Sequence, residues 1–392
     1  MLAIVTTHPI QYQTPIWRAL AENTRVPFEV WYLTDFGTRA SHDREFGKTF
    51  QWDIDLLSGY PYTFLRTEPG ATPGNFWRCR LTERLRERIR ARGVKAVLIQ
   101  GWQVAAYWQV AREAQAACAE VWIRAESNDL NPVPVWKWPI KRAALTYLFS
   151  HIDRFFTIGS GNRRLYLRYG VPETKLFPAH YAVDNARFAA QAKALRGERQ
   201  AIRRQWGIAD DAFCVLFCGK FIAKKRPLDL TDAARIIAAS GADINVHLLF
   251  GGSGELGKTL RAQTHVVFDA DGLGGGQAGA PVASFTGFLN QTEISRAYVA
   301  ADCMVLASDH GETWGLVVNE ALASGLPCIV SNACGCAEDL IAPEWRYSCG
   351  DTTALAERMV ALRAAGAPPP QTLLPSFDQT VAAVAQAYAA LT

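Results

Sequence analysis

The stretch Leu306-Ala-Ser-Asp-His-Gly-Glu-Thr-Trp-Gly-Leu-Val-Val-Asn-Glu-Ala-Leu-Ala-Ser-Gly-Leu-Pro327 decides the fold. It overlaps a strand-like apolar run at 303–307, and Gly315 is expected to open a helix over 316–323. The backbone amides of Gly315 and Leu316 would then lie free at the helix N-terminus, where the helix dipole favours a bound phosphate. The stretch therefore predicts a strand, an anion-binding turn and a helix, in that order.

Two glutamates flank this turn. Glu312 precedes the expected helix, and Glu320 lies inside it, eight residues later. Eight helical residues span ~12 Å at ~1.5 Å per residue. This length is comparable to the distance between the sugar and the ribose of a nucleoside-diphosphate sugar. One carboxylate can then accept hydrogen bonds from the sugar and the other from the ribose, with the phosphates between them.

A second group of charged residues lies upstream, in Cys218-Gly-Lys-Phe-Ile-Ala-Lys-Lys-Arg-Pro227. These residues follow a strand-like run at 213–218. A leaving nucleoside diphosphate develops negative charge, which fixed cations such as Lys220 and Lys225 stabilise. The alternative interpretation is a basic, solvated turn.

With these two motifs the chain resembles the retaining glycosyltransferase family 4 of the GT-B fold. The family signature has two glutamates flanking seven residues, then a small-residue helix and Gly-x-Pro, present here as Glu312, Glu320, Gly325 and Pro327. The family also has a Gly-Arg-x-x-x-x-Lys pattern, which this chain carries with Lys220 in place of the arginine. Cys336 replaces the second glycine of a downstream Gly-Gly turn.

The resemblance implies retaining transfer of a sugar from a nucleoside-diphosphate sugar to a hydroxyl of a glycan or lipid-linked acceptor, in bacterial polysaccharide or glycolipid assembly. No metal and no cofactor are expected. Catalytic positions implied in this way are Glu312, Lys220 and Lys225, to which we add His8. Donor-binding positions are Gly219, Glu320, Gly315, Leu316, Trp314, Gly252, Phe288 and Leu289.

Beyond the two motifs, strand-like runs alternate with helix-like segments, which favours parallel sheets. Strands are predicted at 2–6, 28–34, 96–100, 121–124, 154–158, 179–183, 213–218, 245–250, 283–286, 303–307 and 327–331. Helices are predicted at 82–92, 104–117, 185–205, 228–239, 292–300, 316–323 and 377–391. We expect an α/β protein of two Rossmann-like, doubly wound domains facing each other across a cleft: an acceptor-binding domain at 1–188, a nucleotide-sugar-binding domain at 189–375, and a closing helix at 376–392.

Candidates for the acceptor lie in the first half. His8 and Gln11 follow the first strand; either contacts the donor phosphate or the acceptor hydroxyl, or His8 fixes its own loop. Trp102 lies where family members often carry a histidine. Arg124 and Glu126 end another strand, and they either bind the acceptor and handle its proton or form a buried ion pair.

Two other enzyme classes stay open. Residues 252–259 fit the P-loop pattern Gly-x-x-x-x-Gly-Lys-Thr, which would make the chain a nucleotide hydrolase. No strand with a suitable aspartate pairs with this segment. A GT-B nucleotide-sugar epimerase would use the same donor residues without an acceptor.

Composition and charge limit the classes of partner that this chain is expected to have. Residues 1–185 carry 24 Lys and Arg against 17 Asp and Glu, so the first half is basic although the whole chain is only +4. Trp136 and Trp138 lie among lysines in the stretch 133–142, which suits either a membrane interface or a packed surface loop. No nucleic-acid module is visible. The N-terminus reads as a first strand, no span is apolar enough for a membrane, and nine scattered cysteines suggest reduced thiols. A cytoplasmic enzyme, peripheral to the membrane at most, is expected.

Overall fold

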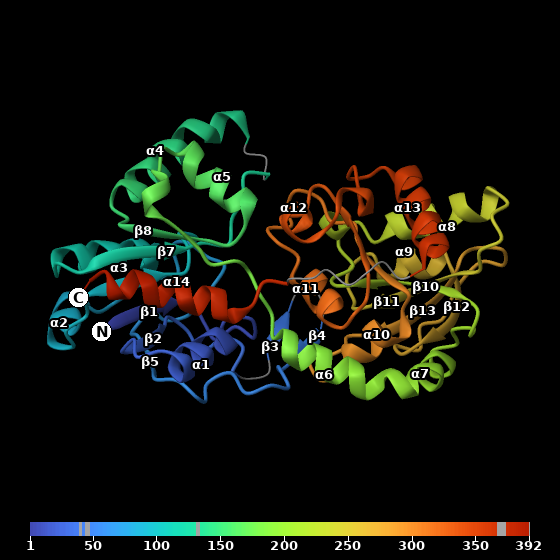
Figure 1. The fold of residues 1–392 in the computed structure, drawn as a ribbon, viewed down its shortest axis with the longest axis horizontal. Helices are drawn as coiled ribbons and strands as arrows, with labels where there is room; N and C mark the ends of the chain where they lie inside the picture. Colours follow the sequence, from blue (N-terminus) through green and yellow to red (C-terminus); the bar gives the residue numbers. More distant parts are fainter. Residues whose placement is uncertain (39–40, 44–47, 131–133, 367–373, 392) are drawn as a thin grey trace. The chain divides into compact units, whose positions relative to one another are not determined.

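The computed structural model describes residues 1–38, 41–43, 48–130, 134–366 and 374–391. The chain forms two compact units (Figure 1). Unit 1 comprises Met1–Ser41, Ile54–Ala182 and Pro375–Thr392, and unit 2 comprises His42–Asp53 and Val183–Leu374. The domain boundaries predicted from the sequence stay predictions.

Unit 1 is built on a parallel sheet of seven strands. Their spatial order is β5 (Tyr62–Phe64), β2 (Phe28–Tyr32), β1 (Leu2–Thr6), β6 (Ala96–Ile99), β7 (Glu120–Arg124), β8 (Arg154–Thr157) and β9 (Leu176–Pro178). Strands β1 and β6 are buried along their whole length, because helices cover both faces of the sheet. The strand order reverses between β1 and β6, where open α/β sheets bind ligands.

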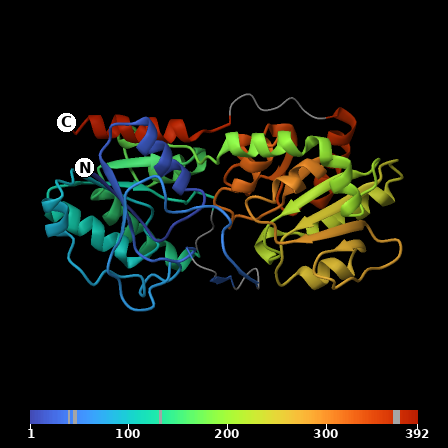
Figure 2. The same cartoon turned by 90° about the horizontal axis from the view of Figure 1, so that it is seen from below.

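Helices cover this sheet on both sides. They are α1 (Thr14–Asn23), α2 (Arg86–Ala91), α3 (Ala105–Ala116), α4 (Trp138–Ser150), α5 (Ser160–Arg168) and α14 (Phe377–Ala389). Trp17 of α1 and Val384 of α14 share one core with the sheet, and Figure 2 shows these two helices side by side. Tyr107 of α3 and Phe149 of α4 belong to the core on the opposite face.

Unit 2 repeats the architecture. Its seven parallel strands lie in the order β12 (His265–Asp269), β13 (Val282–Gly287), β11 (Val246–Gly251), β10 (Phe213–Cys218), β14 (Cys303–Leu306), β15 (Cys328–Ser331) and β16 (Arg346–Tyr347). The helices are α6 (Asn185–Leu195), α7 (Arg199–Gln205), α8 (Leu228–Ala239), α9 (Gly257–Ala262), α10 (Ser295–Ala300), α11 (Leu316–Ala323), α12 (Ala337–Leu340) and α13 (Thr352–Ala365). The short strands β3 (Ser41–Asp43) and β4 (Lys48–Phe50) pair with each other.

The predicted fold class of two doubly wound α/β domains is confirmed, and the central strands lie within two residues of their predicted bounds. The helix predicted at 185–205 is two helices, α6 and α7, joined by a 3-10 turn at Arg196–Glu198. The strand predicted at 179–183 is wrong: β9 ends at Pro178, and the following chain is held to β8 by single backbone bonds from Ala179 and Tyr181.

Six strands were missed. Four of them are edges of the two large sheets, β5, β9, β12 and β16, and the other two, β3 and β4, form the small separate sheet. They are short or partly exposed, and β5 and β12 alternate exposed with half-buried positions. An edge strand has one neighbour and one open side, so it needs no continuous apolar run. The apolar runs that predicted strands occur where both neighbours are present.

Candidate functional site

The turn before α11 has the predicted form. Helix α11 begins at Leu316 with Gly315 as its N-cap residue, at φ 106°. A Cβ at Gly315 would lie 2.5 Å from Cδ2 of Leu306, so a glycine lets the loop close over the end of β14. The free amides at the start of this eight-residue helix therefore lie close to the end of β14, although nine residues of loop separate the two in the chain.

Glu312 and Lys225 form an ion pair beside this turn. Lys225 comes from the loop after β10 and Glu312 from the loop after β14, and their side chains are 21% and 14% exposed. Ser308 donates a hydrogen bond to Oε2 of Glu312 at 3.2 Å, and the amide of Asp309 donates to the carbonyl of Lys224 at 2.9 Å. Two residues predicted from separate motifs are thus brought together by neighbouring strands.

Glu320 lies in α11 and is only 2% exposed. Tyr298 of α10 donates a hydrogen bond to its Oε2 at 2.6 Å. Burial, and after it the charge of Glu320, raises the pKa of the Cys218 thiol to about 12, while Lys225 acts in the opposite direction. The Cys218 thiol, at the end of β10, is therefore close enough to both Glu320 and Lys225 for their charges to change its pKa. Both residues lie around this strand end.

Trp314, a predicted donor-binding residue, makes a hydrogen bond inside the protein. Its indole is buried, and Nε1 donates to Oδ1 of Asn319 at 2.9 Å. The amide of Cys336 donates to the carbonyl of Trp314 at 3.0 Å, and the amide of Gly335 donates to that of Glu312 at 3.2 Å. The segment that carries Cys336 in place of the family glycine thus lies against the loop of Glu312.

Glycines join the loops after β10, β11 and β13. The amide of Gly219 donates to Gly251, and the amide of Gly252 donates to Gly287. A Cβ at Gly252, where φ is 135°, would lie 2.0 Å from the carbonyl oxygen of Gly219. The loop after β10, which carries Lys220, is therefore held by a backbone hydrogen bond and close packing against the loop after β11. Phe288 and Leu289 follow β13 half-buried, and the Phe288 ring lies 6.4 Å from that of Trp52.

The P-loop-like segment has a different geometry from the one its pattern suggests. Lys258 and Thr259 are exposed on the six-residue helix α9. The amide of Phe221 donates to Ser253, and the amide of Leu256 donates to Phe221. A Cβ at Gly254 would lie 2.7 Å from the carbonyl oxygen of Phe221. Protein backbone occupies the concave side of the loop, where a P-loop holds phosphate.

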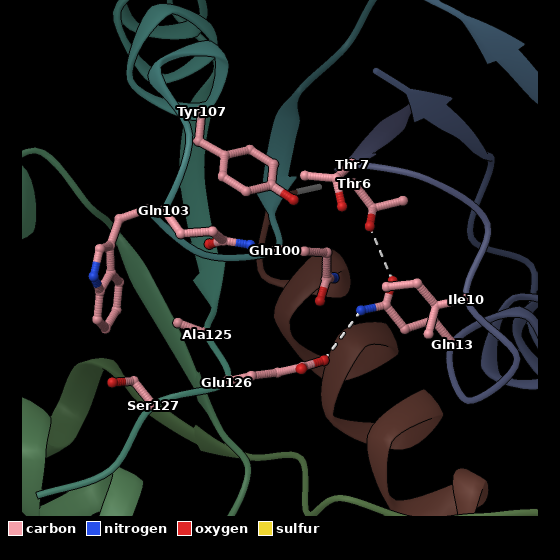
Figure 3. Close-up of a pocket in the computed structure, with 11 residues that line it drawn as sticks. Thr6, Thr7, Ile10, Gln13, Gln100, Gln103, Tyr107, Ala125, Glu126 and Ser127 are labelled. Atoms are coloured by element: carbon pink, nitrogen blue, oxygen red, sulfur yellow. Dashed lines mark hydrogen bonds between the residues drawn. The ribbon is translucent and has the colours of Figure 1, made fainter. Parts of the chain in front are cut away.

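Unit 1 carries a cavity of about 330 Å³ at the carboxyl ends of β1, β6 and β7 (Figure 3). It lies at the point where the strand order reverses. Its lining residues are mostly neutral and polar: Thr6, Thr7, Ile10, Gln13, Gln100, Trp102, Gln103, Tyr107, Ala125, Glu126 and Ser127. The predicted acceptor residues Trp102 and Glu126 lie here, whereas Gln11 and Arg124 are not in the lining.

A hydrogen-bonded chain forms one wall. Thr6 donates to Oε1 of Gln13 at 3.0 Å, and Nε2 of Gln13 donates to Glu126 at 3.3 Å. Tyr181 also donates to Glu126. Gln13 is the N-cap residue of α1 but makes no side-chain cap, because its amide is used in this chain. Thr14 is the first residue of the helix.

Gln100 directly follows β6, and its side chain is buried in the same cavity. Within the described part of the chain, neither its Nε2 nor its Oε1 has a hydrogen-bond partner. Burying a polar group without a partner costs about 1–3 kcal/mol. Gln100, Gln13 and Gln103 were not among the site residues predicted from the sequence, because neutral amides form no motif.

His8 and Arg124 lie next to this cavity. His8 is half-buried, its Nδ1 lies 2.9 Å from Oγ1 of Thr7, and burial lowers its pKa to about 4. It is therefore a neutral imidazole near pH 7. Arg124 is 1% exposed, and its guanidinium lies 4.7 Å over the Tyr181 ring. Within the described part of the chain, none of its three guanidinium nitrogens has a hydrogen-bond partner.

Over the ranges that the structure describes, no group of three His, Cys, Asp or Glu side chains is placed to hold a metal ion. No described helix is long and apolar enough to cross a membrane. All nine cysteines are free thiols.

Comparison with known proteins finds similarity to glycosyltransferases within unit 2. Residues 198–362 match the family described as glycosyl transferases group 1. GDP-mannose-dependent alpha-mannosyltransferase of Mycobacterium tuberculosis (strain CDC 1551 / Oshkosh) is 31% identical over 208 residues, which are 53% of this chain and 45% of that protein. D-inositol 3-phosphate glycosyltransferase of Geodermatophilus obscurus is 33% identical over 176 residues, 43% of this chain and 35% of that protein. The chain thus matches less than half the length of these curated relatives.

Solved structures match the whole chain. HepE of Anabaena in complex with UDP and glucose superposes with a TM-score of 0.59 at 15% identity, covering 100% of this chain and 94% of that one. Sucrose-phosphate synthase of Thermosynechococcus elongatus gives 0.61 at 18% identity with the same coverage, 100% and 94%. At these identities the likeness concerns the fold, and it confirms the predicted GT-B class of two seven-stranded α/β domains.

Proposed function

We propose that this chain, whose residues 198–362 match group 1 glycosyl transferases, transfers a sugar from a nucleoside-diphosphate sugar to a hydroxyl of a glycan or lipid-linked acceptor with retention of configuration. The observation that carries the proposal is the Lys225–Glu312 ion pair beside the N-terminus of α11. It unites a cation, a carboxylate and free backbone amides at one strand end. That combination suits a ligand with both phosphates and hydroxyls.

In this proposal the diphosphate binds at the amides of Gly315 and Leu316. Lys220 and Lys225 neutralise its charge. A bound phosphate competes with Glu312 for Lys225, which releases the Glu312 carboxylate toward the sugar hydroxyls. The exchange of partners costs little energy because a charge-assisted hydrogen bond to phosphate is as strong as one to carboxylate.

Glu320 is proposed to accept hydrogen bonds from the ribose. Its hydrogen bond from Tyr298 fixes the carboxylate before the donor arrives, so binding costs little reorganisation. This role explains why a carboxylate lies in α11 where it is only 2% exposed. Burying a charge is unfavourable unless the charge is paired or hydrogen-bonded, and the ribose hydroxyls would supply such hydrogen bonds.

The chemical step follows from the retaining assignment. The bond between the anomeric carbon and the phosphate oxygen breaks, and the acceptor oxygen bonds to that carbon on the same face. The acceptor proton passes to the leaving phosphate. We propose no protein nucleophile and no metal, and the cations near α11 stabilise the charge on the departing diphosphate.

A two-stage experiment tests the function. Thermal unfolding with a panel of nucleoside diphosphates and their sugars identifies the donor by the rise in melting temperature. The donor is then incubated with and without candidate acceptors, and the anomeric configuration of the product is read by NMR. An epimerised donor sugar formed without an acceptor, or phosphate release that depends on Lys258, would replace the proposal with an epimerase or a nucleotide hydrolase.

We also propose peripheral contact with an anionic membrane, through a surface that we call the aromatic patch. It spans the 3-10 helix Val135–Lys137 and α4, where exposed apolar side chains gather. Their exposed fractions are 88% for Val135, 71% for Trp136, 44% for Trp138, 71% for Ile140 and 64% for Tyr147. Residue 133, the start of the predicted stretch, lies outside the described residues.

The charges near the aromatic patch favour a lipid surface. Lys137, Lys141 and Arg142 lie in it, and residues 134–150 contain no Asp or Glu. Lys137 and Arg142 lie over tryptophan rings, with the Lys137 ammonium 4.7 Å from the ring centre of Trp136. Exposed indoles with cations are typical of segments that lie in the membrane interface.

Vesicle sedimentation tests the membrane contact. With vesicles containing anionic phospholipid, the double variant Trp136→Ser/Ile140→Ser is expected to lose most of its binding. Trp77, in the same unit and 73% exposed, provides the matched control as Trp77→Ser. Equal binding by both variants, or by neutral and anionic vesicles, would refute the patch as a lipid contact.

A further inference from the structure

The cavity of unit 1 has no assigned ligand, and its wall shows what chemistry the ligand needs. Gln100 is the clearest sign: its side chain is 4% exposed, lines the cavity, and has no hydrogen-bond partner for either amide atom among the described residues. Figure 3 shows this side chain in the middle of the labelled residues. A buried amide is normally satisfied, so the partner is expected to come from what fills the cavity.

The donors and acceptors of the wall suit hydroxyl groups. An amide offers an N–H donor beside a carbonyl acceptor, and adjacent hydroxyls of a sugar ring can meet both at once. Gln103 repeats this chemistry, and Thr7 and Ser127 contribute hydroxyls. The volume of about 330 Å³ lies at the small end of ligand pockets, which suits a single ring.

The charge of the wall argues against a phosphorylated ligand. Glu126 is the one acidic side chain among the described lining residues, and no Lys, Arg or His is in the lining. Arg124 lies over the Tyr181 ring and does not line the cavity. A phosphate here would meet a carboxylate without a cation, and like charges at close range repel. A hydroxyl, by contrast, donates well to a carboxylate.

We propose that the cavity of unit 1 binds an uncharged polyhydroxylated ring, the terminal sugar of the acceptor, with Gln100 as its central contact and Glu126 as its charged hydrogen-bond acceptor. This inference rests on the proposed function, because it names the acceptor class of the same transferase. It separates this chain from any relative whose acceptor is a sugar phosphate or an inositol phosphate.

Direct binding to the whole chain, without a donor, tests the proposal. Saturation-transfer NMR is run with methyl glycosides of common hexoses and with myo-inositol, and in parallel with glucose 6-phosphate, mannose 6-phosphate and myo-inositol 1-phosphate. At least one neutral ring is expected to bind, about tenfold or more tighter than its phosphorylated partner. Donor binding is measured separately by thermal unfolding with the nucleotide panel.

Three variants locate the site. Gln100→Glu keeps the size of the side chain but replaces the N–H donor by a second carboxylate, so neutral-ring affinity is expected to fall about tenfold or more. Glu126→Gln is expected to weaken the binding of neutral rings and to reduce the difference in affinity between neutral and phosphorylated rings. Gln115→Glu, the same change on the exposed face of α3, is the control and is expected to change nothing. Melting temperatures show that each variant folds.

The outcomes are separable. If phosphorylated rings bind tighter than neutral ones, if no ring of the panel binds, or if Gln100→Glu binds as the wild type does, the proposed ligand class is overturned. If neutral rings bind as expected but no nucleotide raises the melting temperature, the cavity is a site for neutral sugar rings and the proposed transferase function fails.

Discussion

The candidate sites of the two units lie at equivalent places and use opposite chemistry. Each lies at the carboxyl ends of strands next to the point where the strand order reverses. In unit 2 the groups are a basic and two acidic side chains, Lys225, Glu312 and Glu320, around the end of β10. In unit 1 they are amides and hydroxyls with one carboxylate, Glu126. The same architecture thus carries a site suited to a charged ligand in unit 2 and a site suited to a neutral ligand in unit 1.

The largest effect is expected from the charged site. Lys225→Ala removes a cation that stabilises the departing diphosphate, so kcat should fall by roughly 10²–10³. Lys224→Ala, the same charge change at the exposed neighbouring residue, should cost little. Steady-state kinetics of both variants measure the difference. Equal losses of kcat in the two variants would mean that the local net charge matters and the position of Lys225 does not. The proposed contrast between a charged site in unit 2 and a neutral site in unit 1 would then be wrong.

The next effect concerns donor affinity. Glu320→Gln replaces a charged acceptor of hydrogen bonds by a neutral one, which should weaken nucleotide-sugar binding by about 10–100-fold. Tyr298→Phe leaves the carboxylate but removes the bond that orients it, so a smaller loss of roughly fivefold is expected. Calorimetric titration ranks the two. A larger loss in Tyr298→Phe than in Glu320→Gln would assign Glu320 to packing rather than to the ligand.

Buried histidines allow a comparison by pH. Burial lowers the pKa of His247 in β11 to about 4, and that of His8 in unit 1 likewise to about 4. The unfolded chain takes up these protons near pH 6.5 and the folded chain only near pH 4, so the stabilising contribution is complete above pH 6.5 and is lost as pH falls. For His247, which is 2% exposed, the loss between about pH 7 and about pH 5 is about 2 kcal/mol.

Urea unfolding at the two pH values measures this loss. His247→Gln keeps a side chain that can bond to Ser284, whose Oγ lies 2.9 Å from Nε2 of His247, and should be less sensitive to acid than the wild type. The exposed His265 provides the control as His265→Gln. The same acid sensitivity in all three proteins would assign the pH dependence to other groups.

The smallest effect is expected at the P-loop-like segment. Lys258 is exposed on α9, and Phe221 occupies the concave side of the preceding loop. Lys258→Ala should therefore leave donor binding and transfer within twofold of the wild type, as is usual for surface substitutions. A strong loss of either would restore this segment as a phosphate site and give unit 2 a second charged centre.

The errors of the strand prediction follow one rule. Central strands such as β6 and β10 are buried by two neighbouring strands and two layers of helices, so their apolar runs are visible in sequence. The edge strands β5, β9, β12 and β16 meet only one neighbour and lack such runs. Strand 179–183 was predicted for its apolar residues, which are buried in the core without belonging to a strand.

The amino-acid sequence by itself determined the fold class, the helix α11 with Gly315 at its start, and the charged residues around it, because ionised side chains and glycines at fixed spacing are rare enough to form a pattern. The pairing of Lys225 with Glu312, the hydrogen bond from Trp314 to Asn319, and the shared cavity of Gln13, Gln100 and Glu126 emerged only from the three-dimensional arrangement. The physical reason is that neutral hydrogen-bonding groups gain meaning from burial and from their neighbours in space, and both depend on strands that are distant in the chain.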